Sequence, residues 1–160
     1  MKKQLISGLL LVFMAMSALA FRMAEPGTAA RKGEIKWLTL EEAYVLNQQE
    51  PRKIFVDVYT DWCGWCKRMD KDTFSNSEVA AYVDKNYYAV KLNAESDRAF
   101  KLGEAEMTER QVARQLGVSG YPTVVFIYED FRTIEPVSGY QQADQFMKTL
   151  QAFAAKKLNP

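Results

Sequence analysis

The chain has 160 residues, of which 48% are hydrophobic and 26% are charged. This length suffices for one buried core but is short for two ordinary domains, and the composition excludes disordered and collagen-like chains. The 21 basic and 20 acidic residues leave a net charge of +1, which points to neither nucleic acid nor an acidic membrane as a partner. The chain has no histidine, which excludes an imidazole base, a histidine-ligated metal site and a Ser-His-Asp triad.

The N-terminal segment is typical of an exported protein. Two lysines precede an uncharged apolar run, and Ala18-Leu19-Ala20 has the small-x-small pattern of a signal-peptide cleavage site. We predict a signal peptide at 1–20, a flexible leader at 21–33 and one folded domain at 34–160, in a periplasmic or otherwise extracytoplasmic protein. The alternative is a retained membrane anchor, because 17 apolar residues in a helix span roughly 26 Å.

The rest of the chain alternates predicted strands and helices. Runs of β-branched, aromatic and other apolar residues predict strands at 35–38, 54–59, 88–92, 123–128 and 134–137. Three helix starts are predicted by capping patterns, at Thr39 with Glu42, Ser75 with Glu78 and Thr108 with Gln111, and a last helix is predicted over 143–153. Helical crossovers require parallel pairing and a hairpin requires antiparallel pairing. We therefore expect an α/β fold with a mixed central sheet and helices on both faces.

Two cysteines carry the chemistry of this chain. Cys63 and Cys66 lie at the junction between a predicted buried strand and a helix, where unpaired N–H groups give a positive potential. At such a place the pKa of a thiol falls from about 8.5 to about 3.5–7.5, so a thiolate forms at neutral pH. We expect Cys63 to attack a disulfide and the more buried Cys66 to resolve the mixed disulfide. Gly64 leaves the attacked sulfur unobstructed, and Trp62 provides an apolar wall for a substrate chain.

Three other uses of the cysteine pair are less well supported. A structural disulfide would close a loop of only about four residues and contribute roughly 2 kcal/mol. A structural zinc site requires four Cys or His ligands, and the chain has two cysteines and no histidine. A Cu(I) carrier could use both thiolates, but Met69 is the one soft ligand nearby and is expected to pack in a helix. We therefore expect no metal and no organic cofactor.

Three separate motifs give the chain a resemblance to the thioredoxin superfamily. They are the stretch from Trp62 to Lys67, the preceding Phe55-Val56-Asp57-Val58-Tyr59, and Gly120-Tyr121-Pro122-Thr123 far downstream. The stretch from Asp72 to Val79 is more specifically similar to the periplasmic C-terminal thioredoxin domain of the disulfide reductase DsbD and to small secreted thioredoxin-like proteins. The similarity covers about 53–150 and implies a thioredoxin fold, here with an N-terminal β-α extension.

The resemblance implies roles for individual residues. Cys63 matches the family nucleophile, Cys66 the resolving thiol, and Pro122 a cis-proline that faces the sulfurs. The cis form is not expected from base rates, because only about 5–6% of X-Pro bonds in folded proteins are cis. Tyr121 would then offer its backbone N–H and C=O to an extended substrate segment. The expected substrate-binding residues are Trp62, Gly64, Trp65, Tyr121 and Pro122.

Asp57 and Lys91 match an acid and a lysine that the family keeps behind the active site. A carboxyl group enclosed by a hydrophobic strand has a raised pKa, so Asp57 can take the proton of Cys66 during resolution. The alternative is a solvated aspartate at a strand edge. The sequence differs from the family pattern in two places. Trp65 stands where thioredoxin has a proline, and the segment 95–110 holds about a dozen extra residues. For that segment we predict a solvated charged helix, with a partner-specific surface as the alternative.

These observations predict a thiol-disulfide oxidoreductase that acts as a protein disulfide reductase. Oxidants of this superfamily stabilise the reduced thiolate with a donor between the cysteines, and Trp65 offers only a distant indole N–H. The expected partners are disulfide-containing exported proteins and a membrane thiol electron donor, with the chain a monomer. Alternatives are a disulfide isomerase or oxidase, and a thioredoxin-fold peptide-binding chaperone whose cysteines are inert.

Overall fold

The computed structural model of the chain describes residues 33–157. The predicted signal peptide at 1–20 and nearly all of the predicted leader lie outside the described residues. The strands are β1 (Trp37–Leu38), β2 (Lys53–Tyr59), β3 (Tyr87–Asn93), β4 (Ala99–Leu102), β5 (Ala105–Thr108), β6 (Thr123–Ile127) and β7 (Ile134–Ser138). The helices are α2 (Leu40–Gln49), α3 (Gly64–Met69), the π-helical η1 (Asp70–Phe74), α4 (Ser77–Asn86), α5 (Glu109–Gln115) and α6 (Ala143–Ala155). No helix between residues 33 and 157 has both the length and the apolar character needed to cross a membrane.

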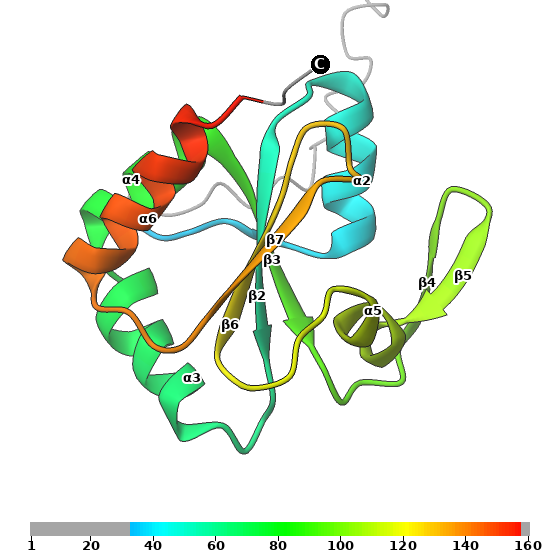
Figure 1. The fold of residues 1–160 in the computed structure, drawn as a ribbon, viewed down its shortest axis with the longest axis horizontal. Coiled ribbons are helices and arrows are strands. Elements are labelled where there is room, and N and C mark those ends of the chain that lie inside the picture. The colour runs from blue at the N-terminus through cyan, green and yellow to red at the C-terminus, as the bar shows by residue number, and fades with distance from the viewer. Residues whose placement is uncertain (1–32, 158–160) are drawn as a thin grey trace, which may run out of the picture.

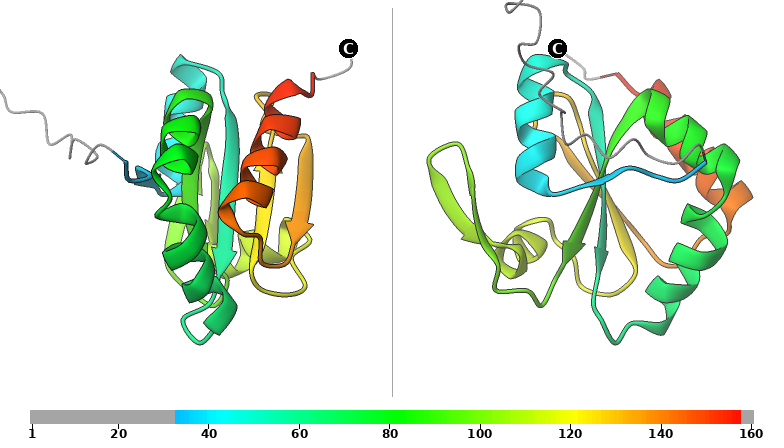
Figure 2. Two further views of the ribbon diagram at one scale, coloured as in Figure 1. Left: turned by 90° about the vertical axis from the view of Figure 1, so that its left-hand side faces the viewer. Right: turned by 180° about the vertical axis from the view of Figure 1, so that it is seen from behind.

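The central sheet has the strand order β1-β3-β2-β6-β7 and is mixed, as predicted. Strands β1 and β2 both run parallel to β3, whereas β6 is antiparallel to β2 and β7 is antiparallel to β6. Figures 1 and 2 show helices on both faces of this sheet. The loops that follow β2 and β3 and the loop that precedes β6 lie at one end of the sheet, because β6 runs in the opposite direction.

The sheet separates two hydrophobic clusters because the side chains of β2 alternate between its faces. Phe55 belongs to the cluster under α3, η1, α4 and α6, where Phe74 and Phe146 lie 6.1 and 5.8 Å from its ring centroid. Its neighbours Ile54 and Val56 belong to the cluster under α2 and α5. All six residues from Lys53 to Val58 are buried, so β2 has the enclosed environment expected of a central strand.

Two of the three predicted capping boxes are confirmed and one is wrong. The boxes at Thr39 and Thr108 are both present, and Gly117 ends the helix after Thr108 with φ of +74°. The predicted box at Ser75 is replaced by Asn76, whose side chain accepts hydrogen bonds from the first turn of α4 at 2.9 and 3.1 Å. The reason is the π-helical turn before it: the N–H of Ser75 still donates to Asp70 O at 3.2 Å, so the next residue, Asn76, is the N-cap of α4.

The charged segment after β3 is a β-hairpin, so the prediction of a solvated helix within 95–110 is wrong. Strands β4 and β5 pair antiparallel around Gly103, which has φ of +62°, and stand apart from the main sheet (Figure 1). Phe100 pairs with Met107, and both contribute to the cluster under α2 and α5. Lys101 and Glu106 alternate with these residues on the other face. Apolar and polar residues therefore alternate with the two-residue period of a strand. With only four residues in each strand, the sequence alone could not distinguish this period from that of a helix.

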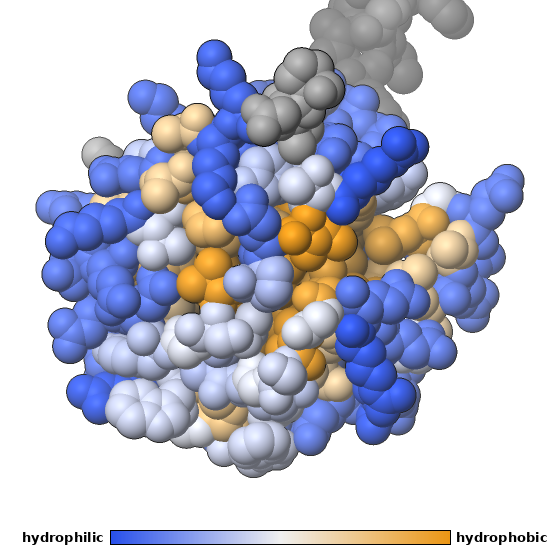
Figure 3. Space-filling view, viewed as in Figure 1, coloured by the Kyte–Doolittle hydropathy of each residue, from blue (hydrophilic) through white to orange (hydrophobic). Residues whose placement is uncertain are grey.

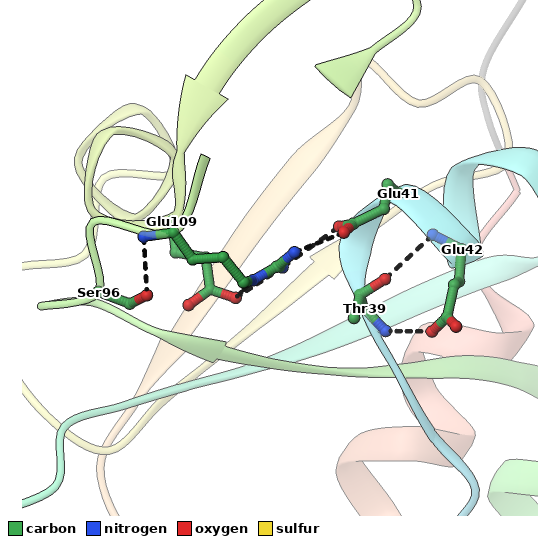
Figure 4. A network of polar contacts seen from close by, with 6 residues as sticks. Thr39, Glu41, Glu42, Ser96 and Glu109 are labelled. Atoms are coloured by element: carbon green, nitrogen blue, oxygen red, sulfur yellow. Dashed lines mark hydrogen bonds and ion pairs between the residues drawn. The ribbon is translucent and has the colours of Figure 1, made fainter. Parts of the chain in front are cut away.

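A polar network connects the hairpin to α2 (Figure 4). The guanidinium group of Arg98 binds Glu41 at 2.5 Å and Glu109 at 2.8 Å, and so joins α2 to the start of α5. The N–H of Arg98 donates to the Ser96 hydroxyl at 3.1 Å. Figure 3 shows apolar residues in the middle of the molecule and along the hairpin, with hydrophilic residues around them. By joining α2 to α5, the network holds Phe100 and Met107 of the hairpin against the cluster under these two helices.

Candidate active site

The cysteine pair lies where β2 leads into α3. Cys63 is the N-cap of α3 and is joined to Cys66 by a disulfide with a Cα–Cα distance of 5.3 Å. The sulfur of Cys63 accepts a hydrogen bond from the N–H of Cys66 at 3.1 Å. Cys63 is 4% exposed and Cys66 is 3% exposed, so the expected difference in burial is absent in this oxidised form. The two bonded sulfurs both lie at the start of the helix, and burial alone does not distinguish the attacking cysteine from the resolving one.

The peptide bond between Tyr121 and Pro122 is cis, as predicted. The carbonyl of Pro122 accepts a hydrogen bond from the N–H of Gly139 at 2.9 Å, which ties this loop to the end of β7. The ring of Tyr121 lies edge-on to that of Trp62 at 6.0 Å between centroids. The proline loop and the residue before Cys63 are therefore neighbours, while the binding of a substrate backbone at Tyr121 stays a prediction.

Trp62 is an exposed aromatic residue held at its polar end. Trp62 is 67% exposed, and its indole N–H donates to both carboxylate oxygens of Glu95 at 3.1 Å. Sequence reasoning did not single out Glu95, which follows β3 and reaches the site only through the fold. Its backbone N–H donates to the Asn93 side chain at 3.0 Å, so the loop that presents it is itself ordered.

Trp65 lies between the two cysteines in sequence and packs against a cation and an aromatic ring. Its ring centroid is 5.4 Å from that of Tyr140, and the guanidinium carbon of Arg68 lies 5.3 and 5.5 Å from these two rings. Arg68 also binds Asp72 at 3.2 Å. Gly64 follows Cys63, and a Cβ added there would meet no atom of the described part of the chain within 4 Å, so the backbone is open on that side.

Asp57 is enclosed in the centre of the sheet and is not a solvated strand-edge residue. It is 1% exposed and faces Lys91 across the β2–β3 pairing, with 2.7 Å between its Oδ2 and the Lys91 Nζ. Its Oδ1 atom has no hydrogen-bond partner among residues 33–157. Burial raises the pKa of Asp57 to about 6, although the charge and hydrogen bond of Lys91 act in the opposite direction. The carboxyl group can therefore gain and lose a proton near neutral pH.

Lys91 is shared between two carboxylates. Besides Asp57 it binds Asp70, which lies on η1 one turn beyond Cys66. Its ammonium group also lies 4.8 Å from the ring centroid of Trp37 and 5.0 Å from that of Tyr59. Burial alone would lower the pKa of Lys91, but the two carboxylates more than offset this, and the net shift is upward. Sequence reasoning missed Asp70; its spacing of four residues from Cys66 on a helix was the available signal.

The arrangement supplies the parts that dithiol chemistry requires. A helix start stabilises a thiolate on Cys63, a second sulfur lies within bonding distance, and a buried carboxyl group with a pKa near neutrality lies in the strand that precedes them. Within residues 33–157, no three side chains of the types His, Cys, Asp and Glu are grouped as metal ligands. The paired sulfurs and the buried carboxyl group are suited to thiol-disulfide exchange.

The sequence from residue 40 to residue 154 matches the family described as the thioredoxin-like domain. The chain belongs to this thioredoxin-like family. Among curated proteins, the chain is 28% identical over 113 residues to the thiol:disulfide interchange protein DsbD of Pectobacterium atrosepticum, which covers 66% of this chain and 17% of that protein. The thioredoxin-like chain thus spans less than a fifth of the length of this curated relative.

Solved structures show the same fold. A thioredoxin from Thermus thermophilus superposes with a TM-score of 0.63 at 20% identity, over 76% of this chain and 88% of that one. The C-terminal domain of Neisseria meningitidis DsbD in its oxidised form superposes with a TM-score of 0.53 at 24% identity, over 69% and 89%. The predicted thioredoxin fold, with its mixed sheet and its additional N-terminal strand, is confirmed.

Proposed function

We propose that this thioredoxin-like protein is a thiol-disulfide oxidoreductase that reduces disulfides in exported proteins. The observation that carries the proposal is the Cys63–Cys66 disulfide at the start of α3, next to a cis-proline loop and in front of the buried Asp57. The curated relative DsbD is named a thiol:disulfide interchange protein, which supports the same class of reaction. Export rests on the signal-peptide pattern of residues 1–20.

The reaction begins from the reduced protein. The Cys63 thiolate attacks one sulfur of the substrate disulfide, and the other substrate sulfur leaves as a thiolate. Cys66 gives its proton to the Asp57 carboxylate and attacks the sulfur of Cys63, which releases the second substrate thiolate. The substrate gains two electrons and the protein is left with the Cys63–Cys66 disulfide. A membrane thiol donor then returns two electrons to the protein by the same exchange in reverse.

The reducing direction is supported by the surroundings of the dipeptide between the cysteines. A protein oxidant requires donors that stabilise the reduced thiolate, and Trp65 instead packs its ring against Tyr140 and Arg68. Measurement of the reduction potential in glutathione buffers tests the direction. We expect a potential below that of the glutathione pool, and a potential near those of oxidising folding catalysts contradicts the proposal and favours an oxidase or isomerase.

A trapping experiment tests the reaction itself. Cys66→Ser leaves Cys63 without its resolving partner, so we expect mixed disulfides with exported proteins, visible as bands that dithiothreitol removes. The control is the double variant Cys63→Ser with Cys66→Ser, which has no nucleophile. A folded Cys66→Ser protein that reacts with alkylating reagents but forms no mixed disulfide contradicts the enzymatic proposal. That outcome favours a peptide-binding module with inert cysteines.

A further inference from the structure

A cluster of four side chains lies on the surface next to Cys66, and the exchange steps described above use none of them to move a proton or an electron pair. We call Trp65, Arg68, Asp72 and Tyr140 the Trp65 cluster. Trp65 is 55% exposed, yet its ring is held by Arg68 at 5.3 Å and Tyr140 at 5.4 Å, and Asp72 fixes Arg68 at 3.2 Å. Exposed ion pairs contribute little to stability, and ordered aromatic and arginine side chains at a surface are characteristic of binding sites.

The Trp65 cluster lies at one end of a groove. The groove has a volume of about 700 Å³, runs between η1 and α4 on one side and α6 on the other, and shares Arg68, Asp72 and Tyr140 with the cluster. Figure 2 (left) shows α4 and α6 side by side. Ala143 and Met147, both partly exposed, give the groove apolar walls. Its lining along α6 extends from residue 142 to residue 151, which at 1.5 Å per residue is about 13 Å, the length of about four extended residues.

The charges of the groove are unequal. Arg68 and Asp72 neutralise each other, whereas Glu78, Asp144 and Lys148 line the groove and take part in no ion pair within residues 33–157. Two acidic groups against one basic group leave the groove with an excess negative charge. A ligand that carries basic side chains is complementary to it.

We propose that this groove docks the extended segment that flanks the reactive cysteine of a partner protein, and that it prefers lysine or arginine in that segment. The proposal rests on the proposed function, because docking there places the partner's disulfide beside Trp65 and Cys63. The Trp65 cluster forms the entrance, the apolar walls receive the stems of long side chains, and Glu78 with Asp144 receives their charges.

Matched disulfide peptides test the proposal with the reduced full-length chain. The four residues on either side of the peptide cysteine contain lysines, glutamines or glutamates, and hydroxyethyl disulfide serves as a substrate with no flanking segment. For the wild type we expect kcat/KM to be about fivefold higher with the lysine peptide than with the glutamine peptide, and lowest with the glutamate peptide. The rate with hydroxyethyl disulfide provides the reference for exchange without docking.

Charge variants assign the preference to the groove. Glu78→Gln with Asp144→Asn is expected to lower kcat/KM for the lysine peptide about fivefold, through KM, and to leave hydroxyethyl disulfide reduction unchanged. Lys148→Glu is expected to raise kcat/KM for the same peptide. The control, Glu104→Gln with Glu106→Gln, removes the same charge from the exposed end of the hairpin and should change nothing. Thermal melts check that each variant is folded.

The possible failures are distinguishable. A lysine preference that survives in the Glu78→Gln, Asp144→Asn variant, or equal rates for all three peptides in the wild type, overturns the docking proposal and leaves the proposed function standing. The same holds if the hairpin control lowers kcat/KM as strongly as the groove variant does. An absence of exchange with hydroxyethyl disulfide refutes the proposed function, and the docking proposal with it.

Discussion

Asp57 is held in the sheet by a compromise between burial and charge. Burial at 1% exposure opposes its ionised form, while Lys91 at 2.7 Å favours it, and the outcome is a pKa of about 6. Lys91 stabilises the Asp57 carboxylate less than an unshared lysine would, because it also binds Asp70. A second carboxylate on η1 therefore weakens the support that the buried carboxylate receives and keeps its proton exchangeable.

Replacing Asp57 is expected to change how stability depends on pH. The folded chain binds this proton more tightly than the unfolded chain, whose pKa is near 3.8, so the contribution is present below about pH 4 and is lost as pH rises through 6. A difference of about two pH units corresponds to about 3 kcal/mol. Urea titrations measure the unfolding free energy of Asp57→Asn minus that of the wild type. This difference should increase by about 3 kcal/mol from pH 4 to pH 7.5.

A second variant checks the direction in which Asp57 makes stability depend on pH. Lys91→Gln removes the cation that favours ionised Asp57, so the pH range over which wild-type stability falls should move upward. If the Asp57→Asn and wild-type profiles remain parallel from pH 4 to pH 7.5, the carboxyl group of Asp57 does not titrate in this range and the argument is wrong.

The same carboxylate is expected to set the rate at which the mixed disulfide is resolved. In Asp57→Asn no base remains to accept the proton of Cys66, so resolution should slow on the order of 10²-fold at pH 7. Stopped-flow mixing of the reduced protein with a peptide disulfide separates the two steps. Attack by Cys63 should keep its rate, which serves as the internal control, and equal slowing of both steps would indicate a general loss of structure.

The hairpin shows how one element is held by a few side chains. A two-stranded sheet is marginal on its own, and here Phe100 is buried under α2 while Arg98 joins Glu41 to Glu109. Arg98 is 41% exposed, so its ion pairs are screened by solvent and contribute little to global stability. Phe100 contributes more, because truncation of a buried phenylalanine costs about 3–5 kcal/mol.

Removal of the Arg98 tether should therefore loosen the hairpin without unfolding the domain. We expect Arg98→Ala to increase amide hydrogen exchange within residues 99–108 by about three- to tenfold, while the unfolding free energy falls by no more than about 1 kcal/mol. Lys101→Ala, on the outer face of β4, is the control and should leave exchange unchanged. Increased exchange across the central strands as well would mean that the network supports the whole fold.

The elements that could be predicted from sequence are those with local signals. The strands around Asp57, the capping boxes at Thr39 and Thr108 and the cysteine motif are all encoded within a few residues. The hairpin was missed because its apolar residues are few and its burial depends on α2, far away in sequence. Glu95 and Tyr140 were missed as site residues for a similar reason, since each reaches the site from a different loop.

The whole molecule places its chemistry at one end of the sheet. The parallel strands β2 and β3 end there, β6 begins there, and the segments that carry Cys63, Glu95 and Pro122 meet as a consequence. Apolar clusters cover both faces of the sheet, and β2, the central strand between them, leads directly to the disulfide. Redox state and folding are therefore expected to be coupled.

This coupling predicts the order of stability of the two redox forms. If the folded chain has the low potential of a reductase, it favours its disulfide more than the unfolded chain does, so the oxidised form must be the more stable one. Each 30 mV between the folded and unfolded potentials corresponds to about 1.4 kcal/mol in this two-electron couple. Guanidinium titrations with and without dithiothreitol measure the difference, and Cys63→Ser with Cys66→Ser controls for effects of the reductant. A reduced form that is more stable than the oxidised form would identify an oxidant and contradict the direction proposed for this protein.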